Sequence, residues 1–379
     1  MSPRIGVHLG TLRGWGSGVV GRSLLNALLQ RSGDYEFVIW VPQEWRVDSS
    51  AGRRELGDNV RLRETRGGLL NKLVLENVEI RRALRRDNID CLFSTGDTSL
   101  VACSRPHLLL VQQAYLAYPQ SSWRFPVSPA FRRKMHLMSA YLRAALPTVS
   151  RVTVQSQHMK AAFSARWSFP AQRIDVIPSA IASAVAQGAY ASNDSVPTAN
   201  ERPYLAYITS AYPHKNHQVL LPMLSALVSR GYDIGCKLSL GAEQVPQFAD
   251  EVRRLGLEGR VEFCGQLSIA GAAELTRGAS VVVIPSKLES FGIIYYEAMA
   301  AGRPIVATDA SFSREALGDT ALYADGDSGD AWAGRVAKLL DDAQFARGLG
   351  ERARNRFERE HLAWSDIASA YLEILQKLC

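Results

Sequence analysis

The chain has 379 residues, of which 47% are hydrophobic and 21% are charged, a composition typical of a globular protein long enough for two domains. No apolar run approaches the ~20 residues that cross a bilayer, and the first residues lack a signal-peptide pattern, so we expect a cytoplasmic protein. Five scattered cysteines, none in a Cys-x-x-Cys pair, argue against a disulfide framework or a zinc site.

Charge is divided unevenly along the chain. The net charge is +7, but residues 1–200 carry 25 Lys/Arg against 14 Asp/Glu, whereas residues 201–379 carry 19 against 23. No acidic residue lies between Asp97 and Asp175, a stretch that holds ten Lys or Arg. Such a field attracts an anionic partner, for example lipid headgroups, a pyrophosphate or nucleic acid, or else it is a solvated basic face.

The first half alternates short apolar runs with amphipathic segments. Residues 4–9 read as a buried strand, followed by a Gly-rich loop over 10–18 and a helix over 21–30. Further strands are expected at 35–41, 91–93, 107–111, 152–154 and 175–177, and further helices at 69–86 and 129–145. This alternation predicts a parallel sheet in an α/β domain.

The second half repeats the alternation after a break. Residues 184–203 lose periodicity and are rich in Ala, Ser, Asn and Pro, so we interpret them as a linker. Strands are then expected at 204–209, 236–240, 261–263, 280–284 and 304–307, and helices at 217–230, 245–255, 269–277, 294–301 and 350–378. We therefore expect α/β domains over 1–183 and 204–360, with ligands bound at the carboxyl ends of the strands.

The densest motif spans residues 280–309. A buried strand ends there at Pro285, and a polar loop with Glu289 leads into a helix that carries Glu297. Free N–H groups at the start of this helix form an anion site, and Gly292 lets a ligand approach the backbone closely. Carboxylates around an anion site suit a ligand with a diphosphate and sugar hydroxyls; two surface glutamates on an ordinary loop and helix are the alternative.

This segment resembles the Glu-x7-Glu signature of glycosyltransferase family 4, whose members are retaining enzymes of GT-B fold. The family pattern P-S-x-x-E-x-F-G-[LI]-P-x-x-E-A-M-A-x-G-x-P-[VI]-V is matched nearly throughout, with a departure at Ile294, where the family usually has proline. The resemblance covers residues 200–379 and, more weakly, 1–190. It implies two Rossmann-like domains facing across a cleft, the first on the acceptor side and the second binding the nucleotide sugar, with a helix at 361–379 that crosses back onto the first.

The resemblance also implies roles for particular residues. Lys215 is the match for a family lysine that neutralises the donor diphosphate, and it is a catalytic candidate together with Glu289, which binds the transferred sugar. Glu297 would bind the ribose hydroxyls, and Gly265 would lie along the base. The amides that hold the diphosphate are those of Ser290, Phe291, Gly292 and Ile293.

Two features of the first domain bear on the acceptor side. Gly16 and Gly18 belong to a G-x-G-x-x-G that ends at Gly21; in the family such a loop closes over the donor phosphates and the acceptor. The same pattern formally fits a dinucleotide fingerprint, which leaves an NAD-dependent oxidoreductase as an alternative. Gln112 stands where the family often has His, and it can hydrogen-bond a sugar hydroxyl but cannot carry charge.

The resemblance thus implies a retaining hexosyltransferase. We expect it to need no metal or other cofactor, because we identify no Asp-x-Asp metal motif, so that protein groups must stabilise the leaving diphosphate. Its donor would be a GDP- or UDP-linked sugar, and its acceptor a glycan or a lipid-linked sugar. The stretch without acidic residues favours an acceptor at a membrane surface, such as a polyprenyl-diphosphate-linked sugar in cell-surface polysaccharide, lipopolysaccharide or O-antigen assembly. A non-catalytic nucleotide-sugar-binding protein and a nucleotide-sugar epimerase are two competing hypotheses.

The basic helix at 129–145 points to a membrane partner. We expect it to hold the protein peripherally at the inner face of the plasma membrane by contact with anionic lipid. Nucleic acid is not expected as a partner, because no recognised binding module accompanies the charge. The basic residues of this patch are Arg132, Arg133, Lys134 and Arg143.

Overall fold

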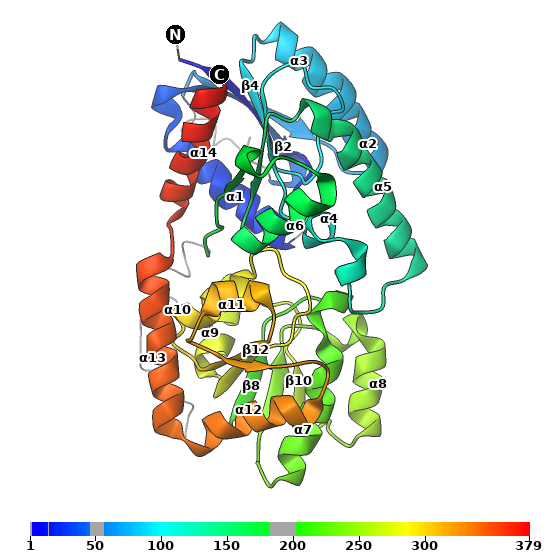
Figure 1. Ribbon diagram of the computed structural model, residues 1–379, viewed down its shortest axis with the longest axis vertical. Coiled ribbons are helices and arrows are strands. Elements are labelled where there is room, and N and C mark those ends of the chain that lie inside the picture. The colour runs from blue at the N-terminus through cyan, green and yellow to red at the C-terminus, as the bar shows by residue number, and fades with distance from the viewer. Residues whose placement is uncertain (1, 14, 46–56, 182–201) are drawn as a thin grey trace. The chain divides into compact units, whose positions relative to one another are not determined.

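The computed structural model describes residues 2–13, 15–45, 57–181 and 202–379, so the predicted linker lies outside the described residues except for its last two. The chain divides into two compact units (Figure 1). Unit 1 consists of residues 1–122, 128–180 and 362–379, and unit 2 of residues 123–127 and 181–361. Each unit is built on one parallel sheet with helices between its strands, which confirms the predicted α/β class.

Unit 1 holds a seven-stranded sheet in the order β3-β2-β1-β4-β5-β6-β7. The central strands are almost completely buried, since helices connect the parallel neighbours and cover the sheet. Ile5 pairs with Phe37 on one side and with Cys91 on the other, which fixes the register at the middle of the sheet. The strands are β1 (Arg4–His8), β2 (Glu36–Pro42), β3 (Val60–Thr65), β4 (Cys91–Ser94), β5 (His107–Leu110), β6 (Arg151–Val154) and β7 (Ile174–Val176).

The helices of unit 1 differ from the sequence-based expectation at two places. The helix predicted from residue 21 begins at Trp15, so Gly16 and Gly18 lie in its first turn and not in a loop. The single helix predicted over 69–86 is interrupted by a π-helical turn, which places Glu76 in the core beside His8. The helices are α1 (Trp15–Leu29), α2 (Leu69–Val74), the π-turn η3 (Leu75–Ile80), α3 (Arg81–Arg86), α4 (Ala114–Ala117), α5 (Pro129–Ala145), α6 (Gln157–Trp167) and α14 (Trp364–Leu378).

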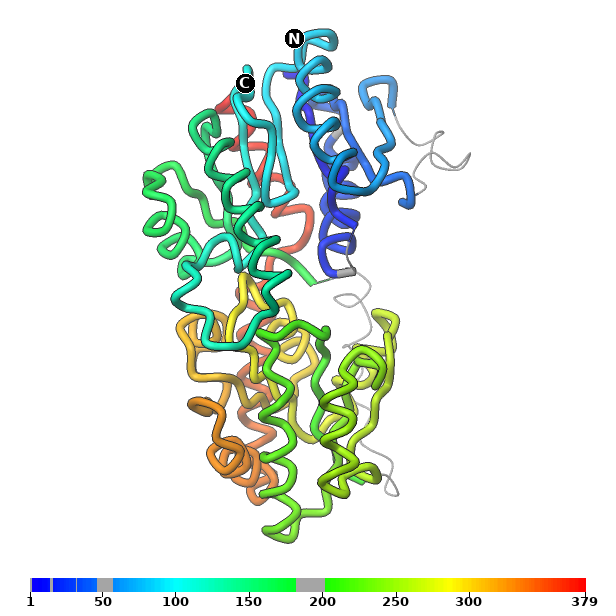
Figure 2. The backbone as a smooth tube through the Cα atoms, turned by 90° about the vertical axis from the view of Figure 1, so that its right-hand side faces the viewer, coloured from blue at the N-terminus to red at the C-terminus, as the bar shows by residue number. Residues whose placement is uncertain are grey.

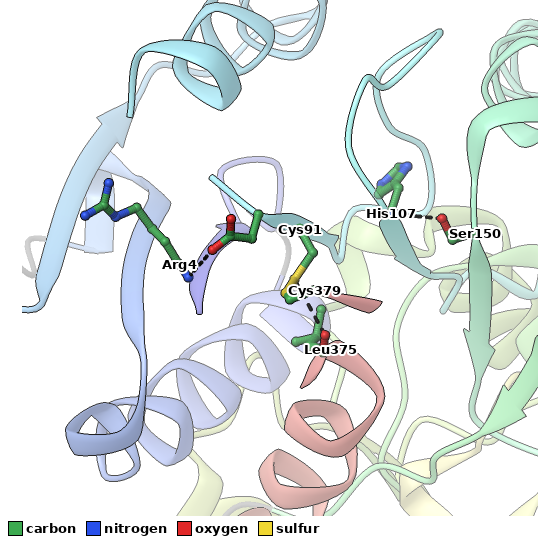
Figure 3. The surroundings of a disulfide bond; sticks show 7 residues. Arg4, Cys91, His107, Ser150, Leu375 and Cys379 are labelled. Carbon is green, nitrogen blue, oxygen red and sulfur yellow. Dashed lines mark hydrogen bonds between the residues drawn. A yellow bond between two sulfur atoms is a disulfide. The ribbon is translucent and has the colours of Figure 1, made fainter. Parts of the chain in front are cut away.

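The C-terminal helix α14 is part of the core of unit 1. It lies beside α1, as Figures 1 and 2 both show, and it buries Ile367, Tyr371 and Leu375. A disulfide joins Cys91 on β4 to Cys379 at the end of α14, with the two Cα atoms 5.4 Å apart (Figure 3). This bond runs against the sequence-based expectation, in which scattered cysteines argued against a disulfide framework. The reason is that its partners are 288 residues apart and only the packing of α14 brings them together.

Unit 2 holds a six-stranded sheet in the order β10-β9-β8-β11-β12-β13. Its strands are β8 (Tyr204–Tyr207), β9 (Gly235–Leu238), β10 (Val261–Phe263), β11 (Val281–Ile284), β12 (Ile305–Thr308) and β13 (Leu322–Ala324). Its helices are α7 (Leu220–Ser229), α8 (Pro246–Arg254), α9 (Ile269–Gly278), α10 (Ile293–Ala300), α11 (Ser311–Leu317), α12 (Gly329–Asp341) and α13 (Ala343–Glu360). The tail predicted as one helix over 350–378 is therefore two, since His361 and Ala363 take extended backbone angles between α13 and α14.

Candidate functional site

The site in unit 2 begins where the strand order of the sheet reverses. β8 is hydrogen-bonded to β9 on one side and to β11 on the other, so the loops that follow β8 and β11 leave the same edge in different directions. Such a switch point is where open α/β sheets bind ligands. The amide of Lys287 donates a 2.7 Å hydrogen bond to the carbonyl of His214, and this bond ties the two loops together.

Lys215 and Glu289 form an ion pair between these loops. The Lys215 ammonium lies 2.6 Å from the Glu289 carboxylate, and the side chains are only 16% and 8% exposed. The hydroxyl of Tyr207, in the core below, donates to the carbonyl of Lys215 at 2.9 Å and so fixes the loop. Burial works to lower the pKa of Lys215, but the negative charge of Glu289 and the influence of Tyr207 outweigh it and raise that pKa. The pairing with Glu289 thus favours the charged form of Lys215.

A second cation of the site was missed by the sequence analysis. Lys287, two residues before Glu289, places its ammonium 2.6 Å from the carboxylate of Asp327, which also accepts a 3.1 Å hydrogen bond from the amide of Asn216. Asn216 follows Lys215 in the left-handed region, at a φ of 53°. The cation-bearing loops are thus fixed to the loop after β13. The sequence contained one clue to this residue, because Lys287 lies inside the motif that includes Glu289.

The helix after the Glu289 loop starts as predicted. Gly292 precedes α10 with a φ of +71°, and a Cβ atom at this position would lie 2.4 Å from the ring of Tyr295. Both the backbone angle and the close approach require glycine. The N–H of Tyr295 donates to the carbonyl of Gly292 at 2.8 Å. The N–H groups of Ile293 and Ile294 come before the first intrahelical bond, so this helix start offers donors to an anion. The ring of Phe291 stacks on Tyr296 with centroids 4.2 Å apart, which leaves its backbone for ligand contact.

Glu297 lies within α10 and is electrostatically unlike Glu289. Its carboxylate has no hydrogen bond or ion pair to any residue that the structure describes, and burial raises its pKa to about 7. A half-buried carboxylate without a protein partner suits a ligand that brings hydroxyl donors. Gly265, after β10, belongs to the same edge of the sheet; it has a φ of +65°, and a Cβ there would meet no atom within 4 Å.

Three predicted site residues, Gly16, Gly18 and Gln112, belong to unit 1. Gly16 and Gly18 lie in α1, so the G-x-G-x-x-G is helical and not the strand-to-helix turn that a dinucleotide fingerprint requires. Gln112 follows β5, and its side-chain amide donates to the carbonyl of Thr95 at 3.1 Å. The loop after β5 is organised by Asp97, a residue that the sequence analysis missed: its carboxylate accepts the amides of Gln112 and Gln113 at 2.6 and 2.7 Å.

The four residues of the predicted basic patch all lie on α5 and are all exposed, but they do not share one surface. The guanidinium of Arg143 lies over the ring of Trp167 in α6, 5.4 Å from its centroid. Arg133 and Lys134 point to other sides of the helix, since successive helical residues are turned by about 100°. Arg143 thus belongs to a contact between α5 and α6.

The described residues contain no cluster of His, Cys, Asp or Glu that could hold a metal ion. The expectation that the sequence contains no Asp-x-Asp motif was wrong, because Asp325 and Asp327 form one after β13. The carboxylate of Asp327 contacts Lys287 and Asn216. None of the helices within the described ranges is both long and apolar enough to span a membrane.

The chain resembles known glycosyltransferases in sequence and in structure. A D-inositol 3-phosphate glycosyltransferase of Corynebacterium glutamicum is 32% identical over 39% of this chain and 38% of its own length. A phosphatidyl-myo-inositol mannosyltransferase of Mycolicibacterium smegmatis is also 32% identical, over 43% of this chain and 42% of its own. The chain thus spans about two fifths of the length of these curated relatives. Among solved structures, Anabaena HepE in complex with UDP and glucose aligns with a TM-score of 0.68 over both whole chains at 15% identity, which shows a shared fold.

Two family models account for nearly the whole sequence. The model of Glycosyltransferase Family 4 matches residues 16–184, and the model of Glycosyl transferases group 1 matches residues 191–356. The second range contains the paired Lys215 and Glu289, the glycine before α10 and the unpartnered Glu297. With both halves matched, and with two parallel-sheet units of the expected kind, the chain belongs to glycosyltransferase family 4 and has the GT-B fold.

Proposed function

We propose that this protein is a retaining glycosyltransferase that uses a nucleotide-diphosphate sugar, with UDP or GDP as the leaving group. The observation that supports the proposal is the Lys215–Glu289 ion pair, which joins the loops after β8 and β11 at the switch point of the sheet of unit 2. The second of these loops leads into α10, which starts after Gly292 and carries Glu297. A cation and free amides stabilise a diphosphate, whereas carboxylates accept hydrogen bonds from hydroxyl groups.

Each group has a defined part in the proposed transfer. When the bond between the anomeric carbon and the diphosphate breaks, the electron pair leaves with the phosphate, and Lys215 and the amides of the α10 start stabilise the charge that develops there. Glu289 orients the transferred sugar and Glu297 holds the ribose. The acceptor hydroxyl adds on the face from which the diphosphate departs, and its proton passes to the departing phosphate oxygen. Gly16, Gly18 and Gln112 act on the acceptor side.

The proposed reaction needs no metal, because protein cations take the role that a divalent ion has elsewhere. Lys215 and Lys287 supply two ammonium groups on neighbouring loops. Activity that is unchanged in excess EDTA supports this assignment, whereas activity that is lost in EDTA and restored by Mg²⁺ or Mn²⁺ contradicts it.

The acceptor is proposed to be lipid-linked and to be met at the cytoplasmic face of a membrane, in the assembly of a cell-surface glycan. Two relatives are named for acceptors with an inositol phosphate or a phosphatidylinositol. Unit 1 exposes several large apolar side chains beside its basic helix: Leu69 and Leu70 at the start of α2 are 70% and 77% exposed, and Leu137 on α5 is 65% exposed. Apolar groups next to Lys and Arg favour an anionic lipid surface.

A thermal-shift screen followed by an activity assay tests the proposed function. UDP, GDP, ADP, NAD and sugar nucleotides are compared; a specific ligand at 100 times its Kd stabilises the folded protein by about 2.7 kcal/mol. We expect a shift with one nucleoside diphosphate and its sugar conjugate, followed by sugar transfer or slow hydrolysis. A shift with NAD alone would point to the oxidoreductase, and loss of donor sugar identity without an acceptor would point to an epimerase.

A non-catalytic nucleotide-sugar-binding protein is the second candidate. It is favoured by Gln112, which stands where the family often has His. Binding of a sugar nucleotide without any transfer or hydrolysis over a range of acceptors would support it.

A further inference from the structure

A pocket in unit 1 is lined by polar and cationic groups that the proposed donor site does not use. It lies between α5, α6 and the turn after α4, and its volume is about 390 Å³. This is within the range of small-molecule sites, roughly 300–1,000 Å³. Its polar and aromatic lining residues are Gln120, His136, Ser139, Arg143, Arg166 and Trp167.

Arg166 is held rigidly by neutral acceptors. One of its terminal nitrogens donates to the carbonyls of Tyr115 and Tyr118 at 2.7 and 2.6 Å, and the other donates to the hydroxyl of Ser139 at 2.9 Å. These three bonds position the guanidinium without neutralising its charge. Two of the five N–H donors of an arginine are left over by this count.

Arg143 brings a second positive charge to the same place. The guanidinium carbons of Arg143 and Arg166 lie 5.4 and 4.8 Å from the centroid of the Trp167 ring. Burial and, after it, the charge of Arg143 lower the pKa of Arg166. Neither arginine forms an ion pair with any carboxylate in the described part of the chain, and no acidic residue lies between Asp97 and Asp175 in the sequence. The repulsion between the two cations is therefore not compensated by the protein.

We propose that this pocket binds a phosphate group, with Arg143 and Arg166 as its cationic ligands. A phosphate offers the negative charge that the pocket lacks and matches the fork of guanidinium donors. His136 and Gln120, whose side-chain nitrogens lie 3.2 Å apart at the rim, are placed to contact the group that carries the phosphate. The source is either a phospholipid headgroup or a soluble phosphorylated sugar.

This inference goes beyond the donor site, since it concerns a second anion site wholly within unit 1. It deepens the proposed function by giving the acceptor or its membrane a charged anchor, and in that respect it rests on the proposed function. Phosphate binding itself needs no donor, so the two proposals fail separately: the donor screen can succeed where phosphate titration fails, and the reverse.

Tryptophan fluorescence supplies a direct test, because Trp167 contacts both guanidinium groups. Titration with inorganic phosphate and with glycerol 3-phosphate is expected to change the emission, and the change should be absent in Trp167→Phe, which assigns it among the seven tryptophans. Arg143→Gln should weaken binding about tenfold or more, as expected for a lost charged hydrogen bond. Arg85→Gln, which alters an exposed arginine on α3, is the matched control and should bind as the wild type does.

A vesicle arm separates the two sources. Phosphatidylcholine vesicles with and without phosphatidic acid are titrated under the same conditions. A Trp167-dependent signal with the soluble phosphates supports a phosphorylated sugar, and one with phosphatidic acid vesicles alone supports a headgroup. No Trp167-dependent signal in either arm, or equal weakening by Arg85→Gln and Arg143→Gln, overturns the proposal. Circular dichroism of each variant confirms that it is folded.

Discussion

The ammonium of Lys215 lies 2.6 Å from the carboxylate of Glu289, although the two residues belong to loops after different strands. Because both side chains are largely buried, removing one partner leaves the other charge without compensation. An incoming diphosphate would meet a cation that is already paired. The pair therefore both positions Lys215 and limits how strongly it attracts an anion in the absence of donor.

Neutralising Glu289 should separate binding from catalysis. In Glu289→Gln the ammonium of Lys215 no longer faces a carboxylate, so UDP or GDP should bind at least as tightly as to the wild type. Turnover should fall about 10- to 100-fold, because one charged hydrogen bond to the sugar is lost. Isothermal titration with the nucleotide and a transfer assay measure the two effects.

Removing the ammonium of Lys215 should lower both nucleotide affinity and turnover. Lys215→Ala is expected to lower turnover by about 10²–10³-fold, as for the loss of a preorganised electrostatic group, and to weaken nucleotide binding as well. Arg347→Ala, at an exposed cation on α13, is the control. If Glu289→Gln weakened nucleotide binding as much as Lys215→Ala does, the roles assigned to the pair would be wrong.

If Glu297 holds the ribose as proposed, nucleotide binding should depend on pH near neutrality. Burial raises its pKa to about 7, so the carboxyl is protonated below that pH and accepts hydrogen bonds from ribose hydroxyls best above it. Nucleotide affinity should rise as the pH is raised from 6 to 8, and the rise should be absent in Glu297→Gln. A Kd that rises with pH in the wild type, or the same profile in both proteins, would argue against this role.

The raised pKa of Glu297 should also make the stability of the protein depend on pH. Stability should fall as the pH rises, whereas nucleotide affinity should increase. A carboxyl whose pKa is higher in the folded than in the unfolded state holds its proton more tightly when folded. Its contribution to stability is therefore present below its ordinary pKa of 4.5 and is lost as the pH rises through about 7. Denaturant melts of wild type and Glu297→Gln should show the wild type losing stability relative to the variant over this range.

The local motif around α10 was predictable from the sequence because its parts are neighbours in the chain. Glu289, Gly292 and Glu297 lie within nine residues, and the predicted order of strand, loop and helix is the one that the structure has, with β11 before the loop and α10 after it. The contacts of Lys287 with Asp327 and of His8 with Glu76 were not predictable, since their partners are 40 and 68 residues apart. Such contacts depend on how strands are ordered in the sheet.

The glycines around residue 16 also led to a wrong prediction of where the first helix begins. The run with Gly14, Gly16 and Gly18 favours a loop, yet α1 already begins at Trp15. Glycine is a poor helix former by about 1 kcal/mol relative to alanine, but the helix continues into an apolar stretch whose Leu24, Leu25 and Leu28 are buried in the core of unit 1. Tertiary packing outweighed the local preference at the start of this helix.

Substitution of Gly292 should both lower the stability of the protein and abolish nucleotide binding. Alanine at a φ of +71° is strained, and its Cβ would lie 2.4 Å from the Tyr295 ring, so Gly292→Ala should cost about 1–3 kcal/mol. The thermal shift caused by UDP or GDP should be lost. Gly348→Ala in α13 is the matched control: its Cβ would meet only Arg352, at 3.7 Å, so its Tm should be unchanged or higher. Equal Tm values for the two variants would contradict the strain argument.

Membrane binding should require the apolar and the basic groups of unit 1 together. Tyr141 of α5 donates to Glu76 and accepts from Asn77, both in the π-turn after α2, so α5 and this segment are fixed side by side. Leu73 and Leu137 each precede that contact by one helical turn. Arg133 and Lys134 lie one helical turn before Leu137 on α5, so we expect these two cations and the exposed leucines to meet one lipid surface.

Flotation with vesicles measures this requirement. The wild type should float with vesicles that contain anionic lipid and not with phosphatidylcholine alone, because each Lys or Arg near an anionic surface contributes about 1 kcal/mol. Replacing Leu69 and Leu70 by Ser should weaken partitioning at least about tenfold, since each leucine gains about 1.5–3 kcal/mol when fully buried. Arg133→Gln with Lys134→Gln should weaken it and reduce its salt dependence. Leu362→Ser, at another exposed leucine, should have no effect; equal flotation with both vesicle types would show that charge does not direct the binding.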